Sequence, residues 1–185
     1  MKKSYNPQKY ESKIYNLWEK GNFLKPDFKK KQGKFCIIMP PPNANASLHI
    51  GHAVFVTLED IMVRYHRMKG KTVLWVPGAD HAGFETQVVF ERHLEEQGKS
   101  RFQFSRSSLY KMMLAFTKKN KRIMKGQLKK LGASCDWSRE KFTLDDDIIK
   151  TVYQTFKKLF QDGLIYRGAR VINWCSHHQT SLSDL

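Results

Sequence analysis

Hydrophobic residues recur at two spacings along the chain, and the spacing predicts which segments are strands and which are helices. Short uninterrupted apolar runs at 35–39 and 72–76 are typical of strands buried on both faces. Between them, hydrophobic residues three and four positions apart predict a helix from about Ser47 to Met68. The residues expected on its buried face are Val54, Leu58, Ile61, Met62 and Tyr65. A strand, a long helix and a strand predict a βαβ unit with a parallel sheet and a right-handed crossover.

The rest of the chain is predicted to be mostly helical. Apolar residues at helical spacing indicate helices at about 7–20, 84–96, 108–131 and 146–161. Two further strands are expected at 164–167 and 170–174, around Gly168-Ala169. The fold class is therefore α/β, with an N-terminal helix ahead of the parallel sheet. One side of the helix at 108–131 is basic and contains Lys118, Lys119, Lys121, Arg122, Lys125, Lys129 and Lys130.

The charge of the chain is strongly positive. Its 33 Lys and Arg residues outnumber its 17 Asp and Glu residues and give a net charge of +16. Such an excess favours a polyanionic partner, because basic side chains that contact phosphates release counterions. A basic protein without such a partner explains the charge equally well, and a solvated helix face explains the basic side of 108–131.

The cysteines and the overall hydropathy point to the cytoplasm as the default compartment. Cys36, Cys135 and Cys175 are odd in number and widely spaced, which does not indicate a disulfide framework. Cys36 stands inside an apolar strand and is expected to be inert core. No run of residues resembles a transmembrane helix or a secretory signal.

Two motifs carry candidate chemistry, and each begins at the carboxyl end of a predicted strand. The first, PPPNANASLHIGH at 40–52, places His49 and His52 at the start of the long helix, with Gly51 between them. A helix N-terminus beside two imidazoles is suited to bind the phosphates of a nucleotide. The second motif, PGADHAG at 77–83, contains Asp80, whose carboxylate can pair with an ammonium group. Alternatively, Asp80 could cap the helix that follows.

These motifs resemble the class I aminoacyl-tRNA synthetases, and the valyl enzymes in particular. The matches to the Trp-x-Pro-Gly-x-Asp-His-Ala-Gly-x-x-Thr-Gln run of the valyl enzymes are Trp75, Pro77, Gly78, Asp80, His81, Ala82, Gly83, Thr86 and Gln87. Further matches lie at 131–140 and at 173–184, so the resemblance extends over nearly the whole chain. Ala46 departs from the pattern, because the family often has glycine there.

The resemblance implies a fold and a reaction. Residues 35–174 would form the first half of a Rossmann-like catalytic domain, after an N-terminal helical extension at 1–34 and before the start of an editing insertion at 175–185. The implied reaction is the activation of L-valine by ATP to valyl-adenylate, followed by transfer to tRNA(Val). ATP is thus a substrate, with Mg²⁺ on its phosphates, and the full-length enzyme is expected to be a cytoplasmic monomer that does not bind a membrane.

The resemblance also assigns site residues. The catalytic residues would be His49 and His52. The ATP-binding residues would be Pro42, Asn43, His49, Gly51 and His52, and the valine-binding residues Pro40, Pro41, Pro42, Asn43 and Asp80. No metal ligand is expected, since Cys175 and His178 would supply only half of a zinc site.

The second, lysine-rich signature of the family is not found, because Lys111-Met112-Met113-Leu114 does not match it. We therefore expect an N-terminal fragment of a longer enzyme, without the editing and anticodon domains. Two alternatives remain open: a small HxGH nucleotidyltransferase, which leaves the motifs at 80–87 and 173–184 unexplained, and a non-catalytic basic module that binds tRNA.

Overall fold

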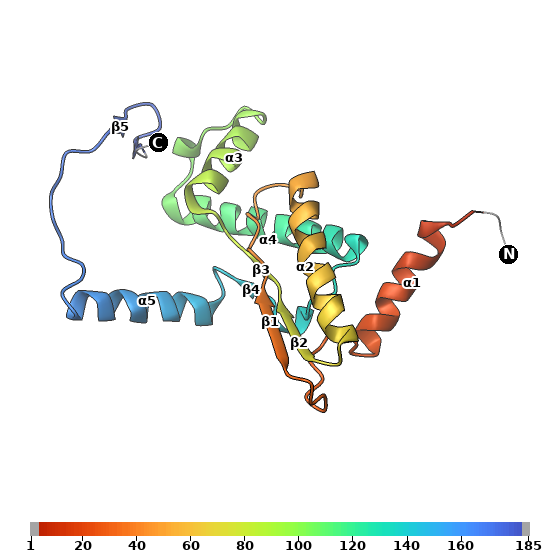
Figure 1. Cartoon of the computed structure of the whole chain (residues 1–185). Helices are drawn as coiled ribbons and strands as arrows, with labels where there is room; N and C mark the ends of the chain where they lie inside the picture. Colours follow the sequence, from red (N-terminus) through yellow and green to blue (C-terminus); the bar gives the residue numbers. More distant parts are fainter. Residues whose placement is uncertain (1–3, 183–185) are drawn as a thin grey trace. The chain divides into compact units, whose positions relative to one another are not determined.

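The computed structural model describes residues 4–182 in two compact units, which divide after residue 145. In the first unit, strand β1 (Lys34–Ile38) pairs in parallel with β2 (Thr72–Val76), from Lys34 opposite Thr72 to Ile38 opposite Val76. Helix α2 (Ile50–Met68) connects the two strands and packs on them (Figure 1). The predicted βαβ unit and its parallel sheet are therefore confirmed.

A third parallel segment lies along the other edge of β2. Strand β3 (Gly78–Ala79) continues β2 beyond Pro77 and pairs with β4 (Lys141–Phe142). The carbonyls of Trp75, Pro77 and Ala79 accept from residues 136, 141 and 143, at 2.9, 3.1 and 3.2 Å. Alternate carbonyls point to opposite edges of a strand, so β1 and β4 lie on opposite sides of this central segment.

The core of the first unit lies between α2, the sheet and helix α4 (Arg106–Leu131). Trp75 is fully buried there, and its indole N–H donates to Glu59 of α2 over 3.0 Å. Gly132 ends α4 with a φ of +84°, a conformation that glycine adopts without a steric cost. The buried residues of this core are Met39, Val56, Val63, Val73, Trp75, Leu128, Ala133 and Cys135.

Two predictions about buried surfaces are wrong. The apolar stripe of α2 expected to be buried (Val54, Leu58, Ile61, Met62, Tyr65) is exposed, and the helix instead buries Val56 and Val63. The physical reason is that Glu59 and Asp60 find hydrogen-bond partners inside, which makes the polar side of the helix the packed side. Cys36 is likewise exposed rather than core, because its face of β1 is not covered by any described residue of the first unit.

A buried tyrosine of helix α1 (Pro7–Lys20) binds the segment that follows α4. The hydroxyl of Tyr15 donates to the carbonyl of Ala133 over 2.7 Å and accepts from the indole N–H of Trp137 over 2.6 Å. Burial raises the pKa of Tyr15 far above its ordinary value of 10, so the hydroxyl keeps its hydrogen.

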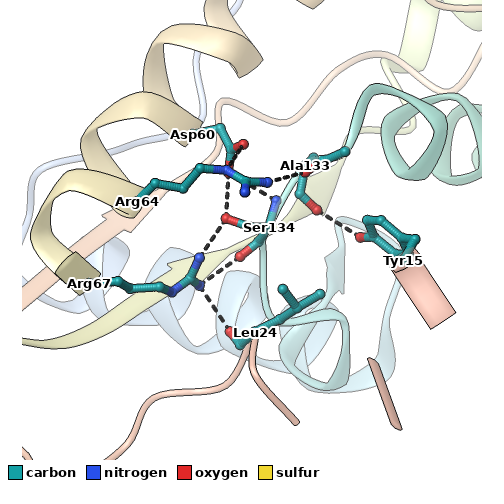
Figure 2. Close-up of polar contacts among 8 residues, drawn as sticks. Tyr15, Leu24, Asp60, Arg64, Arg67, Ala133 and Ser134 are labelled. Carbon is teal, nitrogen blue, oxygen red and sulfur yellow. Dashed lines mark hydrogen bonds and ion pairs between the residues drawn. The ribbon is translucent and has the colours of Figure 1, made fainter. Parts of the chain in front are cut away.

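A polar network fixes the carboxyl half of α2 to the loop after α4 (Figure 2). Asp60 accepts from the backbone N–H of Ser134 over 3.0 Å, from the Ser134 hydroxyl, and from Nε of Arg64 over 2.6 Å. Arg67 donates to the carbonyls of Ser134 and Leu24, over 2.7 and 3.1 Å. The network thus joins α2, the 132–136 loop and the segment after α1.

The remaining elements of the first unit are helix α3 (Gly83–Glu95) and the short helices η1 (Arg101–Gln103) and η2 (Trp137–Arg139). The second unit consists of helix α5 (Asp146–Gln161) and an antiparallel pair, β5 (Trp174–Cys175) with β6 (Thr180–Ser181). Its helix confirms the prediction for 146–161, while Ser183 and Asp184 of the matched motif lie outside the described residues.

The strands predicted at 164–167 and 170–174 are wrong, because only Trp174 is in a strand. A strand requires a neighbour for its N–H and C=O groups, and the described part of the chain offers none to residues 164–172. Val171 is fully exposed, so the apolar composition of this segment does not reflect burial within the described chain.

The exposed stripe of α2 predicts that a protein of these 185 residues self-associates. Val54, Leu58, Ile61, Tyr65 and Met68 are between 51% and 80% exposed, and apolar patches of this kind promote association. Light scattering after size exclusion should detect oligomers, and Leu58→Glu with Ile61→Glu should shift them toward the monomer. A monodisperse wild-type monomer with a sharp thermal transition would contradict the prediction.

Asp60→Asn should loosen the 132–136 loop, because it removes the charge that Arg64 and the Ser134 groups face. We expect a local destabilisation of about 2 kcal/mol, typical of a lost hydrogen bond to a charged group. Hydrogen exchange of peptides that cover 130–137 in the full-length protein measures it. The matched control is Asp162→Asn, at the residue after α5, whose exposed pair with Lys158 should contribute little. Equal exchange in both variants would refute a role for the network.

Candidate functional site

The candidate site lies where the three parallel segments end. Asn43, after β1, pairs with Asp80, after β3, and the register that places Ala79 opposite Phe142 puts Asp80 beside Thr143. The backbone N–H of Asp80 donates to Pro42 over 2.9 Å, and that of Ala44 to the Asp80 carbonyl over 2.7 Å. Three polar side chains therefore stand in one row at the carboxyl edge of the sheet, the edge where α/β sheets bind ligands.

A cavity of about 460 Å³ opens beside this row. Its wall consists of residues 40–43, 45–49, His52 and Phe55. Of the residues predicted to bind ATP or valine, it brings together Pro40, Pro41, Pro42, Asn43, His49 and His52. Asp80 and Gly51 do not line the cavity, although Asp80 is held to its wall by the backbone bonds to Pro42 and Ala44.

The two histidine side chains cap α2 by accepting hydrogen bonds from backbone N–H groups at its start. Helix α2 begins at Ile50, three residues later than predicted, because His49 rather than Ser47 is the N-cap. The Nδ1 of His49 accepts from the backbone N–H of Gly51 over 3.1 Å, and the Nδ1 of His52 accepts from the backbone N–H of His49 over 3.3 Å. A neutral imidazole that accepts at Nδ1 carries its hydrogen on Nε2. Both rings therefore have an Nε2–H that can donate.

Gly51 makes room for this arrangement. A Cβ at position 51 would meet the ring of His49 at 2.9 and 3.0 Å, closer than ordinary packing allows. The glycine between the histidines thus permits the ring of His49 to fold over the helix start, where its centroid lies 4.0 Å from that of His52.

Burial and the neighbouring His49 lower the pKa of His52 below its ordinary value of 6.5. Burial contributes most, because it disfavours the charged ring, and the second imidazole adds to the effect. His52 is therefore neutral at pH 7, which agrees with an Nδ1 that accepts a backbone hydrogen.

Gln127 of α4 fixes the residue that precedes the histidines. Its side-chain oxygen accepts from the backbone N–H of Leu48 over 2.9 Å, and its amide nitrogen donates to the Leu48 carbonyl over 3.4 Å. A long-range pair of bonds to the backbone of one residue restrains the entry to α2, and with it the direction of His49. The sequence did not indicate Gln127, which lies 79 residues away.

Asp80 does not cap the helix that follows. The N-cap of α3 is Ala82, with a φ of +54° and no side-chain cap, and the carboxylate of Asp80 instead accepts from the hydroxyl of Thr143 over 3.0 Å. Thr86, buried in α3, donates to the carbonyl of His81 over 2.6 Å and so supports the turn between Asp80 and α3. About a third of the Asp80 side chain is exposed, so it remains accessible to a ligand.

The basic side of α4 is divided between internal partners and solvent. Lys125 pairs with Glu140 over 2.9 Å and Lys129 with Glu19 over 2.7 Å. Both ammonium groups also lie over the ring of Trp137, at 4.9 and 5.9 Å. The exposed basic residues of this side are Lys118, Lys119, Arg122 and Lys130. Of the seven basic residues predicted on this side, only these four would therefore be available to contact nucleic acid phosphates.

Cys175 is the last residue of β5 and His178 lies in the turn before β6, with Sγ 3.3 Å from Nδ1. Within residues 4–182, no group of three or more His, Cys, Asp or Glu side chains is placed to hold a metal ion. The described residues that line the cavity also include no carboxylate. The same part of the chain contains no helix with the length and hydrophobicity needed to cross a membrane.

Comparisons with known proteins identify the family of the chain. A family model described as tRNA synthetases class I (I, L, M and V) matches residues 13–185. A chloroplastic/mitochondrial valine–tRNA ligase of Arabidopsis thaliana is 49% identical over 95% of the chain and 18% of its own length. The valine–tRNA ligase of Dehalococcoides mccartyi is 48% identical over the whole chain and 21% of its own length. The chain thus spans about a fifth of the length of these curated relatives.

A solved structure gives the same fold. The LeuRS of Agrobacterium radiobacter K84, in a ternary complex with tRNA and LeuAMS, matches 98% of this chain and 21% of its own, with a TM-score of 0.78. Sequence identity is 23%, so the likeness concerns the fold alone. It agrees with the expected first half of a Rossmann-like catalytic domain.

The capping geometry predicts the state of both histidine rings. In ¹⁵N-histidine spectra of the full-length protein at pH 7, assigned with His49→Gln and His52→Gln, Nδ1 should be unprotonated in each ring. His52 should titrate below 6.5. Because the folded-state pKa is the lower one, the unfolded chain binds the proton first, so stability falls as the pH drops below about 6.5. A hydrogen on Nδ1 of either ring at pH 7, or a pKa of His52 above 6.5, would contradict this geometry.

Proposed function

Because the chain belongs to the class I tRNA synthetases (I, L, M and V), we propose that it carries the amino-acid and ATP sites of a valine–tRNA ligase. The observation that supports this most directly is the position of Asp80 at the carboxyl edge of the sheet, beside the cavity that His49 and His52 line. A site for an ammonium group next to a site for phosphates suits the joining of an amino acid to a nucleotide. Valine is proposed as the amino acid because relatives of this name share almost half of the residues.

The proposed first step requires no nucleophile from the protein. An oxygen of the valine carboxylate attacks the α-phosphate of ATP, the bond between the α-phosphorus and the bridging oxygen breaks, and pyrophosphate leaves with its electron pair. Catalysis then consists of positioning and of stabilising phosphate charge. The Nε2–H groups of His49 and His52, with the amino end of α2, supply donors for that charge.

Asp80 would hold the substrate by its ammonium group. A carboxylate that is partly buried and fixed by a hydrogen bond pairs well with a cation, since little order is lost on binding. Pro40, Pro41 and Pro42 provide a rigid apolar wall beside it for the aliphatic side chain. Asn43, which stands in the same row, would bond either substrate.

Mg²⁺ bound to the ATP phosphates would neutralise part of their charge. Because the described lining of the cavity provides neutral imidazole, amide and hydroxyl groups, these residues fit an ion that the nucleotide itself carries rather than a protein-held ion. The steps assigned to His49, His52 and Asp80 do not depend on its geometry.

The proposed second step transfers the valyl group to the terminal adenosine of tRNA(Val). The net charge of +16 and the exposed Lys118, Lys119 and Arg122 support binding to a polyanion. The three cysteines are unpaired, which supports a reducing compartment, and we propose the cytoplasm. The monomeric state and the boundaries at 34/35 and 174/175 likewise remain proposals.

Amino-acid-dependent exchange of pyrophosphate into ATP tests the proposal in the full-length protein. Valine should support exchange, and Asp80→Asn should raise the KM for valine about 10- to 100-fold, the usual effect of removing a charged hydrogen-bond partner. Asp27→Asn is the control, because the Asp27 side chain is exposed and accepts from the nearby backbone N–H of Lys29, a bond that an amide oxygen can also accept. His52→Gln should lower kcat.

Absence of exchange with every amino acid, together with RNA binding that ignores ATP, would replace the proposal with a non-catalytic RNA-binding module. Exchange in which Asp80→Asn leaves the KM for valine unchanged would remove Asp80 from the site.

A further inference from the structure

The hydroxyl of Thr143 uses its whole hydrogen-bonding capacity within the site. It donates to Oδ1 of Asp80 over 3.0 Å, accepts from the backbone N–H of His81 over 2.9 Å, and lies 2.6 Å from the ring Nδ1 of His81. A hydroxyl has one hydrogen to donate and two lone pairs that accept. All three positions are therefore occupied.

This geometry determines which nitrogen of His81 carries the hydrogen. The carboxylate of Asp80 has no hydrogen to give, so the Thr143 hydroxyl hydrogen is committed to it. The Nδ1 of His81 must then be the donor in its contact with Thr143. In the neutral ring, Nε2 is consequently bare and accepts, which is the opposite tautomer from the one deduced for His49 and His52.

We propose that Thr143 is a positioning residue for the ammonium group of the amino acid substrate, an inference that rests on the function proposed above. Its hydroxyl directs the carboxylate of Asp80 and fixes His81 in the tautomer with a bare Nε2. The two acceptors left for a substrate cation are then Oδ2 of Asp80 and Nε2 of His81. Both side chains are 35–39% exposed, so a ligand can reach them.

The hydroxyl can be removed without breaking the sheet. The strand pairing at this position uses the backbone N–H of Thr143, which donates to Ala79, and Phe142 is bound through its own N–H by Asp145. Valine has the shape of threonine and is favoured in strands, so Thr143→Val removes the hydroxyl and keeps the backbone. The effect of the variant therefore reports on the side-chain bonds.

The variant Thr86→Val separates an effect on the Asp80 carboxylate and the His81 ring from an effect on the His81 backbone. The hydroxyl of Thr86 gives its one hydrogen to the backbone carbonyl of His81 rather than to the Asp80 carboxylate. A loss confined to Thr143→Val thus points to the carboxylate and the imidazole ring, whereas an equal loss in Thr86→Val points to the backbone of His81.

The test is pyrophosphate exchange by the full-length protein, with Thr143→Val, Thr143→Ser, Thr86→Val and the control Thr117→Val. Thr117 is buried, as Thr86 is, but its hydroxyl donates to the carbonyl of Leu114 within its own helix. We expect Thr143→Val to raise the KM for the amino acid about tenfold, the effect of a lost hydrogen bond of about 1.4 kcal/mol, with the KM for ATP nearly unchanged. Thr143→Ser should restore the wild-type value. An unchanged amino-acid KM, or an equal rise in both KM values, would overturn the proposal.

A second measurement keeps the test independent of activity. The ¹⁵N-histidine spectrum of the wild-type protein should show His81 with its hydrogen on Nδ1, and Thr143→Val should abolish that preference. A wild-type ring with its hydrogen on Nε2 would overturn the proposal even if exchange with valine were observed. Conversely, a wild-type protein that lacks exchange but has the Nδ1–H ring would refute the proposed function and leave the placement of Thr143 correct.

Discussion

The arrangement of the site depends on the backbone hydrogen bonds along both edges of residues 75–80. Carbonyls of this central segment accept alternately from the β1 side, at Met39 and Ala44, and from the β4 side, at residues 136, 141 and 143. Pro77 has no N–H, so its carbonyl is its only contribution to the sheet. Because both neighbours are bound in parallel, the chain segments that leave the sheet emerge at the same edge. Asn43, Asp80 and Thr143 stand side by side for that reason.

Helix α2 holds His49 and His52 in a fixed position relative to the sheet because hydrogen bonds restrain the helix near both of its ends. Gln127 binds the backbone N–H and C=O of Leu48 just before the first turn, and Asp60 binds Ser134 nearer the last turn. The reciprocal caps of His49 and His52 then set the two rings relative to the helix end. Side chains that must meet a phosphate group in one geometry benefit from such support, since little conformational entropy is lost on binding.

The local patterns of the sequence predicted the elements well where a periodic run was long or a strand was central. The helices at 7–20, 108–131 and 146–161, and the strand at 72–76, begin and end within two residues of their predicted limits. Periodicity misjudged the buried face of α2, because it counts hydrophobic residues and cannot foresee that Glu59 and Asp60 find partners inside. Gln127 and Thr143 carry no local signal, since their roles arise from contacts 79 and 63 residues away along the chain. The motif residues of the site were found through the family pattern, whereas the groups that hold them required the structure.

A crystal structure of the full-length protein with a non-hydrolysable valyl-adenylate analogue tests the central claim most directly. The ammonium group of the analogue should lie within hydrogen-bonding distance of Asp80, with the His81 ring beside it. The group that replaces the α-phosphate should lie within hydrogen-bonding distance of Nε2 of His49 or His52. An analogue bound with its ammonium group away from Asp80, or with its phosphate mimic away from the start of α2, would contradict the account.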